Sequence, residues 1–202
     1  MHGKILDVTI HSAIGLDDVD KSGKNDPYVV VYTDLKNIKG TGGRTRALSG
    51  TKKPVWNETL SLEDIDNNTR YLYVDIMDKE TTVDEPIGFA AIPLDQVTHA
   101  TNHRFDGTFQ VYTYKGKAKG TIDITLIMRE RGQPQQNVDS SHCNFRDGVT
   151  VIDEAHKSHI KSLDRMENLA DVLQVAAAVG GLFAASKFLG GGDDKKKAAK
   201  EH

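Results

Sequence analysis

Apolar and polar residues alternate with a period of two in short segments of the first 130 residues. This period is typical of strands with one buried face, because successive side chains of a strand point to opposite faces. It predicts strands at 4–12, 28–32, 56–62, 71–77, 87–94, 108–114 and 120–128. Segments rich in glycine, proline, asparagine or aspartate separate them. Many short strands between such turns indicate an all-β antiparallel sandwich or barrel.

The pattern changes after residue 131. Residues 132–150 are polar and contain glycine, proline, glutamine and serine, so we interpret them as a linker. From residue 151 the apolar residues recur at three and four, which predicts a helix. Small apolar residues continue to about residue 189, and a charged end follows. We therefore expect a strand-rich domain at 1–131, a polar linker at 132–150 and a helical tail at 151–202.

Composition narrows the possible functions. The net charge is −3, which argues against a general nucleic-acid binder. The single cysteine, Cys143, excludes an intrachain disulfide and a four-cysteine zinc site. The N-terminus lacks a secretory apolar run and no apolar stretch is long enough to span a membrane, so we expect a cytoplasmic protein. No nucleophile elbow or phosphate-binding loop indicates an enzyme.

Acidic residues gather in two inter-strand loops, at 17–28 and 78–88. Carboxylates that crowd together repel one another unless a cation neutralises them. Oxygen ligands at variable spacing suit calcium, which accepts flexible geometry, whereas no pair of histidines completes a zinc or copper site. The two loops therefore indicate either a calcium site or ordinary solvated turns.

Three sequence blocks, in this order, resemble the C2 domain family: Asp20-x5-Asp26-Pro27-Tyr28-Val29, then Lys53-Pro54-Val55-Trp56-Asn57-Glu58, then an acidic loop that ends in Ile87-Gly88. The resemblance covers about residues 4–129. The layout is similar to short single-C2 proteins, the elicitor-responsive group of plants and their fungal relatives. The resemblance implies an eight-stranded antiparallel β-sandwich of type II topology, with calcium-binding loops at one end and a C-terminal helical extension after it.

The resemblance also implies a ligand set for Ca²⁺. The metal-binding positions of the family match Asp20 and Asp26 in the first acidic loop, and Asp78 in the second. Glu80 stands where a second aspartate is usual, and either Asp84 or Glu85 would supply the last ligand. The loop is one residue shorter than the family pattern, which leaves calcium affinity and stoichiometry open.

Two further groups of residues are candidates for contact with lipid. Bound calcium would cancel the negative charge of the loops, so that anionic phospholipids could approach and Val83 could insert shallowly. Arg44, Arg46, Lys52 and Lys53 precede Trp56, in the region where some C2 domains bind phosphoinositide headgroups. A solvated strand that resists edge pairing is the alternative for these basic residues.

Together these patterns predict calcium-dependent binding to anionic phospholipid membranes, for membrane recruitment or signalling, by a protein reversibly peripheral at membranes. The alternative is a calcium-independent protein-interaction scaffold or oligomer that uses the sandwich face and the tail at 151–189. Small residues at four-residue spacing in that tail permit close helix packing, on the chain itself or on a partner, and membrane contact is the competing interpretation.

Overall fold

The computed structural model of this protein describes residues 3–19 and 25–166. They belong to one compact unit, Met1–Glu167. Asp20 and the tail beyond residue 166 lie outside the described residues, so the predictions for them are untested. No helix within the described part is long and apolar enough to cross a membrane.

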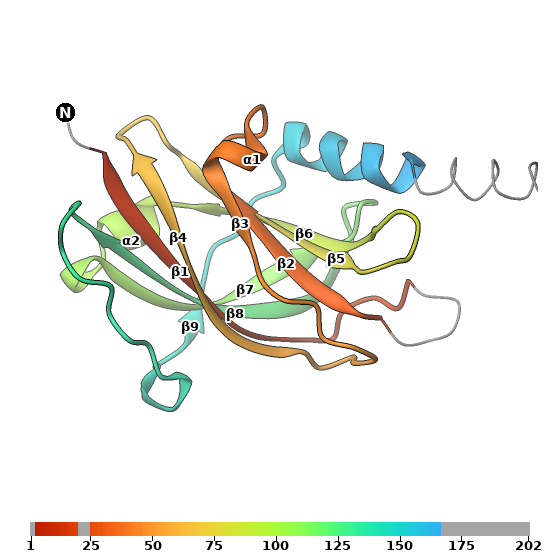
Figure 1. The fold of residues 1–202 in the computed structure, drawn as a ribbon, viewed down its shortest axis with the longest axis horizontal. Coiled ribbons are helices and arrows are strands. Elements are labelled where there is room, and N and C mark those ends of the chain that lie inside the picture. Colours follow the sequence, from red (N-terminus) through yellow and green to blue (C-terminus); the bar gives the residue numbers. More distant parts are fainter. Residues whose placement is uncertain (1–2, 20–24, 167–202) are drawn as a thin grey trace, which may run out of the picture. The chain divides into compact units, whose positions relative to one another are not determined.

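The described residues form nine strands (Figure 1): β1 Lys4–Ile14, β2 Pro27–Tyr32, β3 Gly42–Arg44, β4 Val55–Ile65, β5 Tyr71–Asp78, β6 Glu85–Pro93, β7 Arg104–Tyr112, β8 Ala118–Arg129 and β9 Arg146–Asp147. Short helical turns lie between them: α1 Ile38–Thr41, α2 Asp95–Thr98, η1 Thr101–His103 and η2 Ser140–His142. A longer helix covers residues 154–166. The predicted all-β antiparallel sandwich with a C-terminal helix is confirmed.

The strands follow one hydrogen-bonded order, β3-β2-β5-β6-β7-β8-β1-β4. The link between β6 and β7 is a single residue pair, Phe89 and Tyr112, and there the order folds into two layers. The first layer is β3-β2-β5-β6 and the second is β7-β8-β1-β4. The first and last long strands, β1 and β8, are therefore neighbours.

The core lies between the two layers and follows the alternation of the sequence. In β5, for example, Leu72, Val74 and Ile76 are completely buried and point to the other layer. Burial of such side chains contributes about 2 kcal/mol each. The opposite faces of the strands point away from this core, so each layer also has an outer face.

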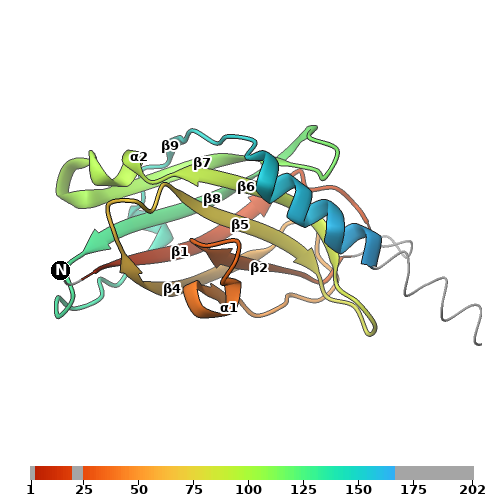
Figure 2. The same cartoon turned by 90° about the horizontal axis from the view of Figure 1, so that it is seen from above.

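Both outer faces are covered by the C-terminal part of the chain (Figure 2). Residues 130–150, which we call the strap, cross the second layer, where β9 pairs in parallel with β7. Val151 then bridges to Ala91 of β6, and the helix at 154–166 lies along the first layer, where His156 and Ile160 are completely buried. The segment predicted as a linker thus also packs on the sandwich.

Candidate functional site

The β2–β5 pairing places the first residues of the two acidic loops side by side. In this register Pro27 is opposite Asp78. The backbone N–H of Asp26 donates to Asp78 Oδ1 at 2.6 Å, and the N–H of Lys79 donates to the carbonyl of Asp26 at 3.1 Å. Two predicted ligands, more than fifty residues apart in sequence, therefore meet at one end of the sandwich.

Trp56 explains why two of the sequence blocks occur together. Its side chain is 1% exposed, and its indole N–H donates to the carbonyl of Pro27 at 3.3 Å. The start of β4 is thereby fastened to the start of β2. The turn before β4 also contacts the residue that precedes β2, because the Gly50 N–H and the Ser49 hydroxyl donate to the carboxylate of Asp26.

The β5–β6 hairpin brings the remaining predicted ligands to this end. Glu85 is opposite Asp78 in the register. The carboxylate of Asp84 accepts three hydrogen bonds, from the Tyr28 hydroxyl at 2.7 Å, from Lys79 Nζ at 2.8 Å and from the Glu80 N–H at 2.9 Å. The Asp84 carboxylate is therefore held against the Tyr28 hydroxyl.

These contacts shift two pKa values. Burial raises the pKa of Asp84, but the hydrogen bonds from Lys79, Tyr28 and the Glu80 backbone outweigh it and hold that pKa below its usual value. Burial, together with the bond to Asp84, raises the pKa of the Tyr28 hydroxyl. At neutral pH the pair is thus a carboxylate that accepts a hydrogen bond from a neutral phenol.

The structure brings together only part of the predicted calcium set. Asp26 and Asp78 are adjacent, and Glu85 lies opposite Asp78. Glu80 contacts Asp84 through its backbone N–H, which donates to Asp84 Oδ1. Within residues 3–19 and 25–166, no three histidine, cysteine, aspartate or glutamate side chains are close enough to hold a metal ion. The donor atoms are hard oxygens, which fit calcium, but Asp84 must turn away from its present partners to join them.

Lysines pair with some of the acidic side chains at this end. Lys52 lies 2.5 Å from Asp18, and Lys119 lies 3.7 Å from Asp17. Together with Lys79 they give this end built-in counter-ions. Lys79 was missed as a functional residue in the sequence, although a lysine directly after the predicted ligand Asp78 is a signal that could have found it.

The predicted basic residues divide into two groups. Arg44 and Arg46 line a pocket of about 390 Å³. Its lining residues are Tyr28, Arg44, Thr45, Arg46, Ala47 and Lys79. The Arg44 guanidinium lies 5.9 Å from the centre of the Tyr28 ring, and Arg46 pairs with Glu58 at 2.9 Å. Lys52 and Lys53 are exposed outside this pocket, and Val83 is half-buried.

The outer face of the first layer holds a polar group that the sequence did not reveal. Asp75 accepts from the Tyr32 hydroxyl at 3.1 Å and lies 2.6 Å from His156 Nε2. The rings of Tyr73 and Phe89 pack edge-on against the His156 imidazole. This face is therefore occupied by the chain's own helix.

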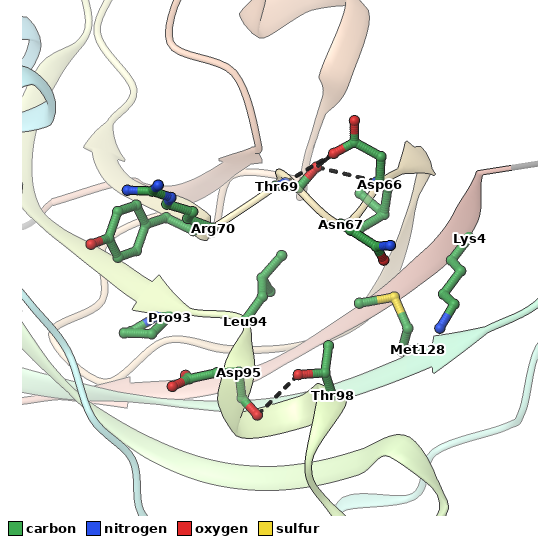
Figure 3. Close-up of a pocket in the computed structure, with 12 residues that line it drawn as sticks. Lys4, Asp66, Asn67, Thr69, Arg70, Pro93, Leu94, Asp95, Thr98 and Met128 are labelled. Atoms are coloured by element: carbon green, nitrogen blue, oxygen red, sulfur yellow. Dashed lines mark hydrogen bonds between the residues drawn. The ribbon is translucent and has the colours of Figure 1, made fainter. Parts of the chain in front are cut away.

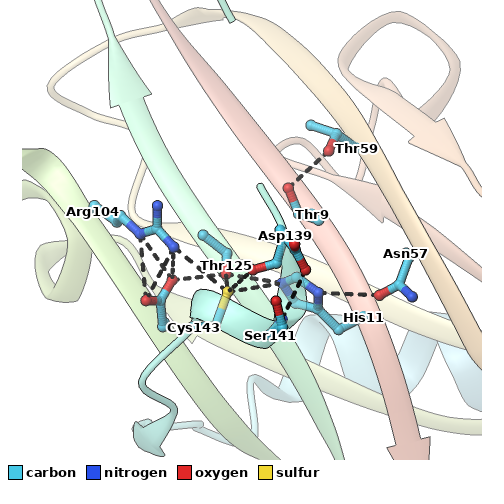
Figure 4. Close-up of polar contacts among 10 residues, drawn as sticks. Thr9, His11, Asn57, Thr59, Arg104, Thr125, Asp139, Ser141 and Cys143 are labelled. Atoms are coloured by element: carbon cyan, nitrogen blue, oxygen red, sulfur yellow. Dashed lines mark hydrogen bonds and ion pairs between the residues drawn. The ribbon is translucent and has the colours of Figure 1, made fainter. Parts of the chain in front are cut away.

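The outer face of the second layer has a comparable network under the strap (Figure 4). His11 is 3% exposed and contacts Asn57 Oδ1 at 3.3 Å and Thr125 Oγ1 at 2.9 Å. Burial lowers the pKa of His11, although Asn57 and nearby carboxylates oppose this shift. Cys143 of the strap closes the network, with its sulfur 3.9 Å from His11 Nε2 and 3.5 Å from Arg104 Nη2.

A second pocket, of about 480 Å³, opens at the opposite end of the sandwich (Figure 3). Its charged residues are of both signs: Lys4, Asp66, Arg70 and Asp95. The carboxylate of Asp66 is already engaged by the backbone and hydroxyl of Thr69. None of the residues predicted to bind metal or lipid is among the described residues that line this pocket.

Comparisons with known proteins agree with this architecture. Residues 4–111 match the C2 domain family. A calcium-dependent lipid-binding protein of Arabidopsis thaliana is 32% identical over 95 residues, which are 47% of this chain and 18% of that protein. Tricalbin-2 of Saccharomyces cerevisiae is 30% identical over 127 residues, 62% of this chain and 10% of that protein. This chain thus spans only a small part of the length of either relative.

Solved structures show the same fold. A C2 domain of a plant extended synaptotagmin 1 superposes with a TM-score of 0.55 at 21% identity, over 66% of this chain and 99% of that domain. A C2 domain-containing protein whose gene is described as elicitor-responsive has a TM-score of 0.51 at 27% identity, over 67% and 96% of the two chains. The family match covers more than half of the residues, and the chain therefore belongs to the C2 domain family.

Proposed function

We propose that this protein binds anionic phospholipid membranes in response to calcium, through the end of the sandwich where the two acidic loops meet. The observation that carries the proposal is the hydrogen bond from the Asp26 backbone N–H to the Asp78 carboxylate, because it brings acidic residues of two separate loops to one end of the sandwich. A relative named for calcium-dependent lipid binding supports the same function.

The residues have separate tasks in this proposal. Asp26, Asp78 and Glu85 hold calcium together with Asp20, and Asp84 joins them once it leaves Tyr28. Calcium, when bound, supplies positive charge at a place where lipid phosphate can complete its coordination.

The surroundings of the loops supply the contact with lipid. Arg44 and Arg46 line a pocket next to Lys79, where a phosphate can be held by charge-assisted hydrogen bonds. Val83 belongs to the loop between β5 and β6 and enters the membrane surface shallowly. Lys52 and Lys53 add positive charge that attracts the anionic surface over a distance of about 10 Å at moderate salt.

Co-sedimentation of the full chain with vesicles of phosphatidylserine and phosphatidylcholine tests the proposal. The native protein pellets with calcium and stays in solution with a chelator. Replacing two ligands in one variant, Asp26→Asn with Asp78→Asn, weakens calcium-dependent binding on the order of 100-fold, because calcium affinity follows the charge of the ligand set.

A matched variant controls for the loss of two negative charges. Glu63→Gln with Asp95→Asn makes the same change near the opposite end, where Asp95 lines the second pocket. This control keeps native binding. Unchanged calcium-dependent pelleting of the Asp26 and Asp78 variant would sink the assignment. Equal pelleting with calcium and chelator would overturn the calcium dependence, and no pelleting under either condition would favour the calcium-independent protein-interaction scaffold.

A further inference from the structure

In the loop between β5 and β6, Lys79 contacts oxygen atoms of the kind that a metal ion would use. Its Nζ lies 2.8 Å from Asp84 Oδ1 and 3.4 Å from the backbone carbonyl oxygen of Glu80. Carboxylate and backbone carbonyl oxygens are also the oxygens that ligate calcium in proteins. The ammonium group thus stands in the place of a cation beside a predicted ligand.

Three hydrogen bonds engage the Asp84 carboxylate without a metal. Oδ1 accepts from Lys79 and from the Glu80 N–H, and Oδ2 accepts from the Tyr28 hydroxyl. A calcium ion that takes Asp84 Oδ1 must therefore displace Lys79 from it. The ion pair is accessible, since the Lys79 side chain is 51% exposed and the Asp84 side chain 21% exposed, and exposed ion pairs are weak enough to exchange.

Once displaced from Asp84, the Lys79 ammonium group can turn into a neighbouring pocket. Lys79 also lines the pocket of about 390 Å³ that contains Arg44 and Arg46. Arg46 is paired with Glu58, whereas Arg44 and Lys79 repel one another unless an anion lies between them. While Lys79 is bound to Asp84, this repulsion is reduced. Once calcium replaces it, the pocket has one more cation for a phosphate.

We propose that Lys79 is an exchangeable counter-cation: it neutralises Asp84 in the absence of calcium, and when calcium takes Asp84 its ammonium binds the phosphate of an anionic lipid beside Arg44 and Arg46. This inference rests on the proposed function. It makes Lys79 a competitor of calcium and a partner of lipid, so that its removal has opposite effects on the two affinities.

Calcium titration of the full chain by isothermal titration calorimetry tests whether Lys79 competes with calcium. Lys79→Gln lowers the Kd for calcium about fivefold, because calcium no longer competes with an ion pair of this kind. Lys119→Gln is the matched control: it makes the same charge change at the same end, its side chain is 50% exposed, and it lies 3.7 Å from Asp17. The control changes the Kd less than about twofold.

The outcomes separate this inference from the proposed function. Equal effects of Lys79→Gln and Lys119→Gln would overturn the inference and leave the proposed function standing. Calcium binding by Lys79→Gln but not by the native chain would support the inference and overturn calcium dependence of the native protein. Absence of calcium binding in both would overturn both, because removing the competitor would then have opened no site.

Vesicle binding at saturating calcium tests whether Lys79 binds the lipid phosphate. With vesicles of phosphatidylserine and phosphatidylcholine, Lys79→Gln binds about threefold more weakly than the native chain although it binds calcium more tightly. Lys79→Arg keeps the charge and restores lipid binding. Lipid binding of Lys79→Gln equal to that of the native chain would overturn the role in phosphate binding.

Discussion

Two carboxylates of the β5–β6 hairpin each accept a hydrogen bond from a tyrosine of β2, but one carboxylate is buried and the other is accessible to water. Asp75, in the middle of β5, accepts a hydrogen bond from the Tyr32 hydroxyl at 3.1 Å. Asp84, just before β6, accepts one from the Tyr28 hydroxyl at 2.7 Å. Both tyrosines belong to β2, and in both cases burial together with the neighbouring carboxylate raises the pKa of the phenol.

The second partner of each carboxylate differs in accessibility. His156 contacts Asp75, and the two side chains are 0% and 5% exposed. Lys79 contacts Asp84, and these side chains are 51% and 21% exposed. Water and ions can therefore replace Lys79, whereas His156 leaves only when the helix at 154–166 leaves the sheet.

The comparison shows that burial decides what a polar pair does. A buried pair costs free energy to break, because the remaining partner is left without water, so Asp75 and His156 hold the helix on the sheet. An exposed pair adds little stability and exchanges readily, which suits Asp84 to the binding of an ion. The same strand pair thus supplies a fixed contact and an exchangeable one.

The largest expected effect comes from removing the imidazole of the buried pair. His156→Ala leaves Asp75 buried with Tyr32 as its remaining recorded partner and leaves a space between the rings of Tyr73 and Phe89. We expect the free energy of unfolding to fall by about 3 kcal/mol. Urea unfolding followed by the fluorescence of Trp56, the single tryptophan, measures it.

An exposed histidine provides the control for that measurement. His142 lies 3.4 Å from Asp139 with its side chain 83% exposed. His142→Ala changes the free energy of unfolding by less than about 0.5 kcal/mol. Equal losses in the two alanine variants would contradict the distinction between buried and exposed pairs.

A smaller effect separates the two tyrosines. Tyr32→Phe and Tyr28→Phe each remove one hydroxyl and keep the ring. We expect a loss of about 2 kcal/mol for Tyr32→Phe, because Asp75 is buried, and about 1 kcal/mol for Tyr28→Phe, because water reaches Asp84. Urea unfolding of both variants checks the order, and a larger loss for Tyr28→Phe would reverse the comparison.

The sequence identified one member of the exposed pair, Asp84, and neither member of the buried pair. Asp84 belongs to an acidic loop between two alternating segments, a local pattern that can be read along the chain. The strand ranges were predictable for the same reason, since alternation is local. Lys79 was adjacent to a predicted ligand, yet its contact depends on how the loop closes.

The buried pair could not be read in this way. Asp75 and His156 are 81 residues apart and meet only because the strap carries the helix to the outer face of the first layer. In the sequence, Asp75 is one polar residue of an alternating strand, and His156 is one of several histidines to which no role was assigned. The covering of both outer faces is a property of long-range packing, which a local pattern does not encode.

The smallest expected effect concerns a buried histidine that has neutral partners. His11 contacts Asn57 and Thr125, whereas His156 contacts a carboxylate, and burial lowers the pKa of His11 below the ordinary 6.5. As the pH falls below 6.5, the unfolded chain binds the proton first, so this residue lowers stability progressively between 6.5 and its folded-state pKa and has no effect above that window. Titration of the His11 ring protons by NMR shows a midpoint below 6.5, and His11→Gln removes this part of the pH dependence of unfolding. A midpoint at or above 6.5 would contradict this prediction and mean that the carboxylates near His11 outweigh its burial.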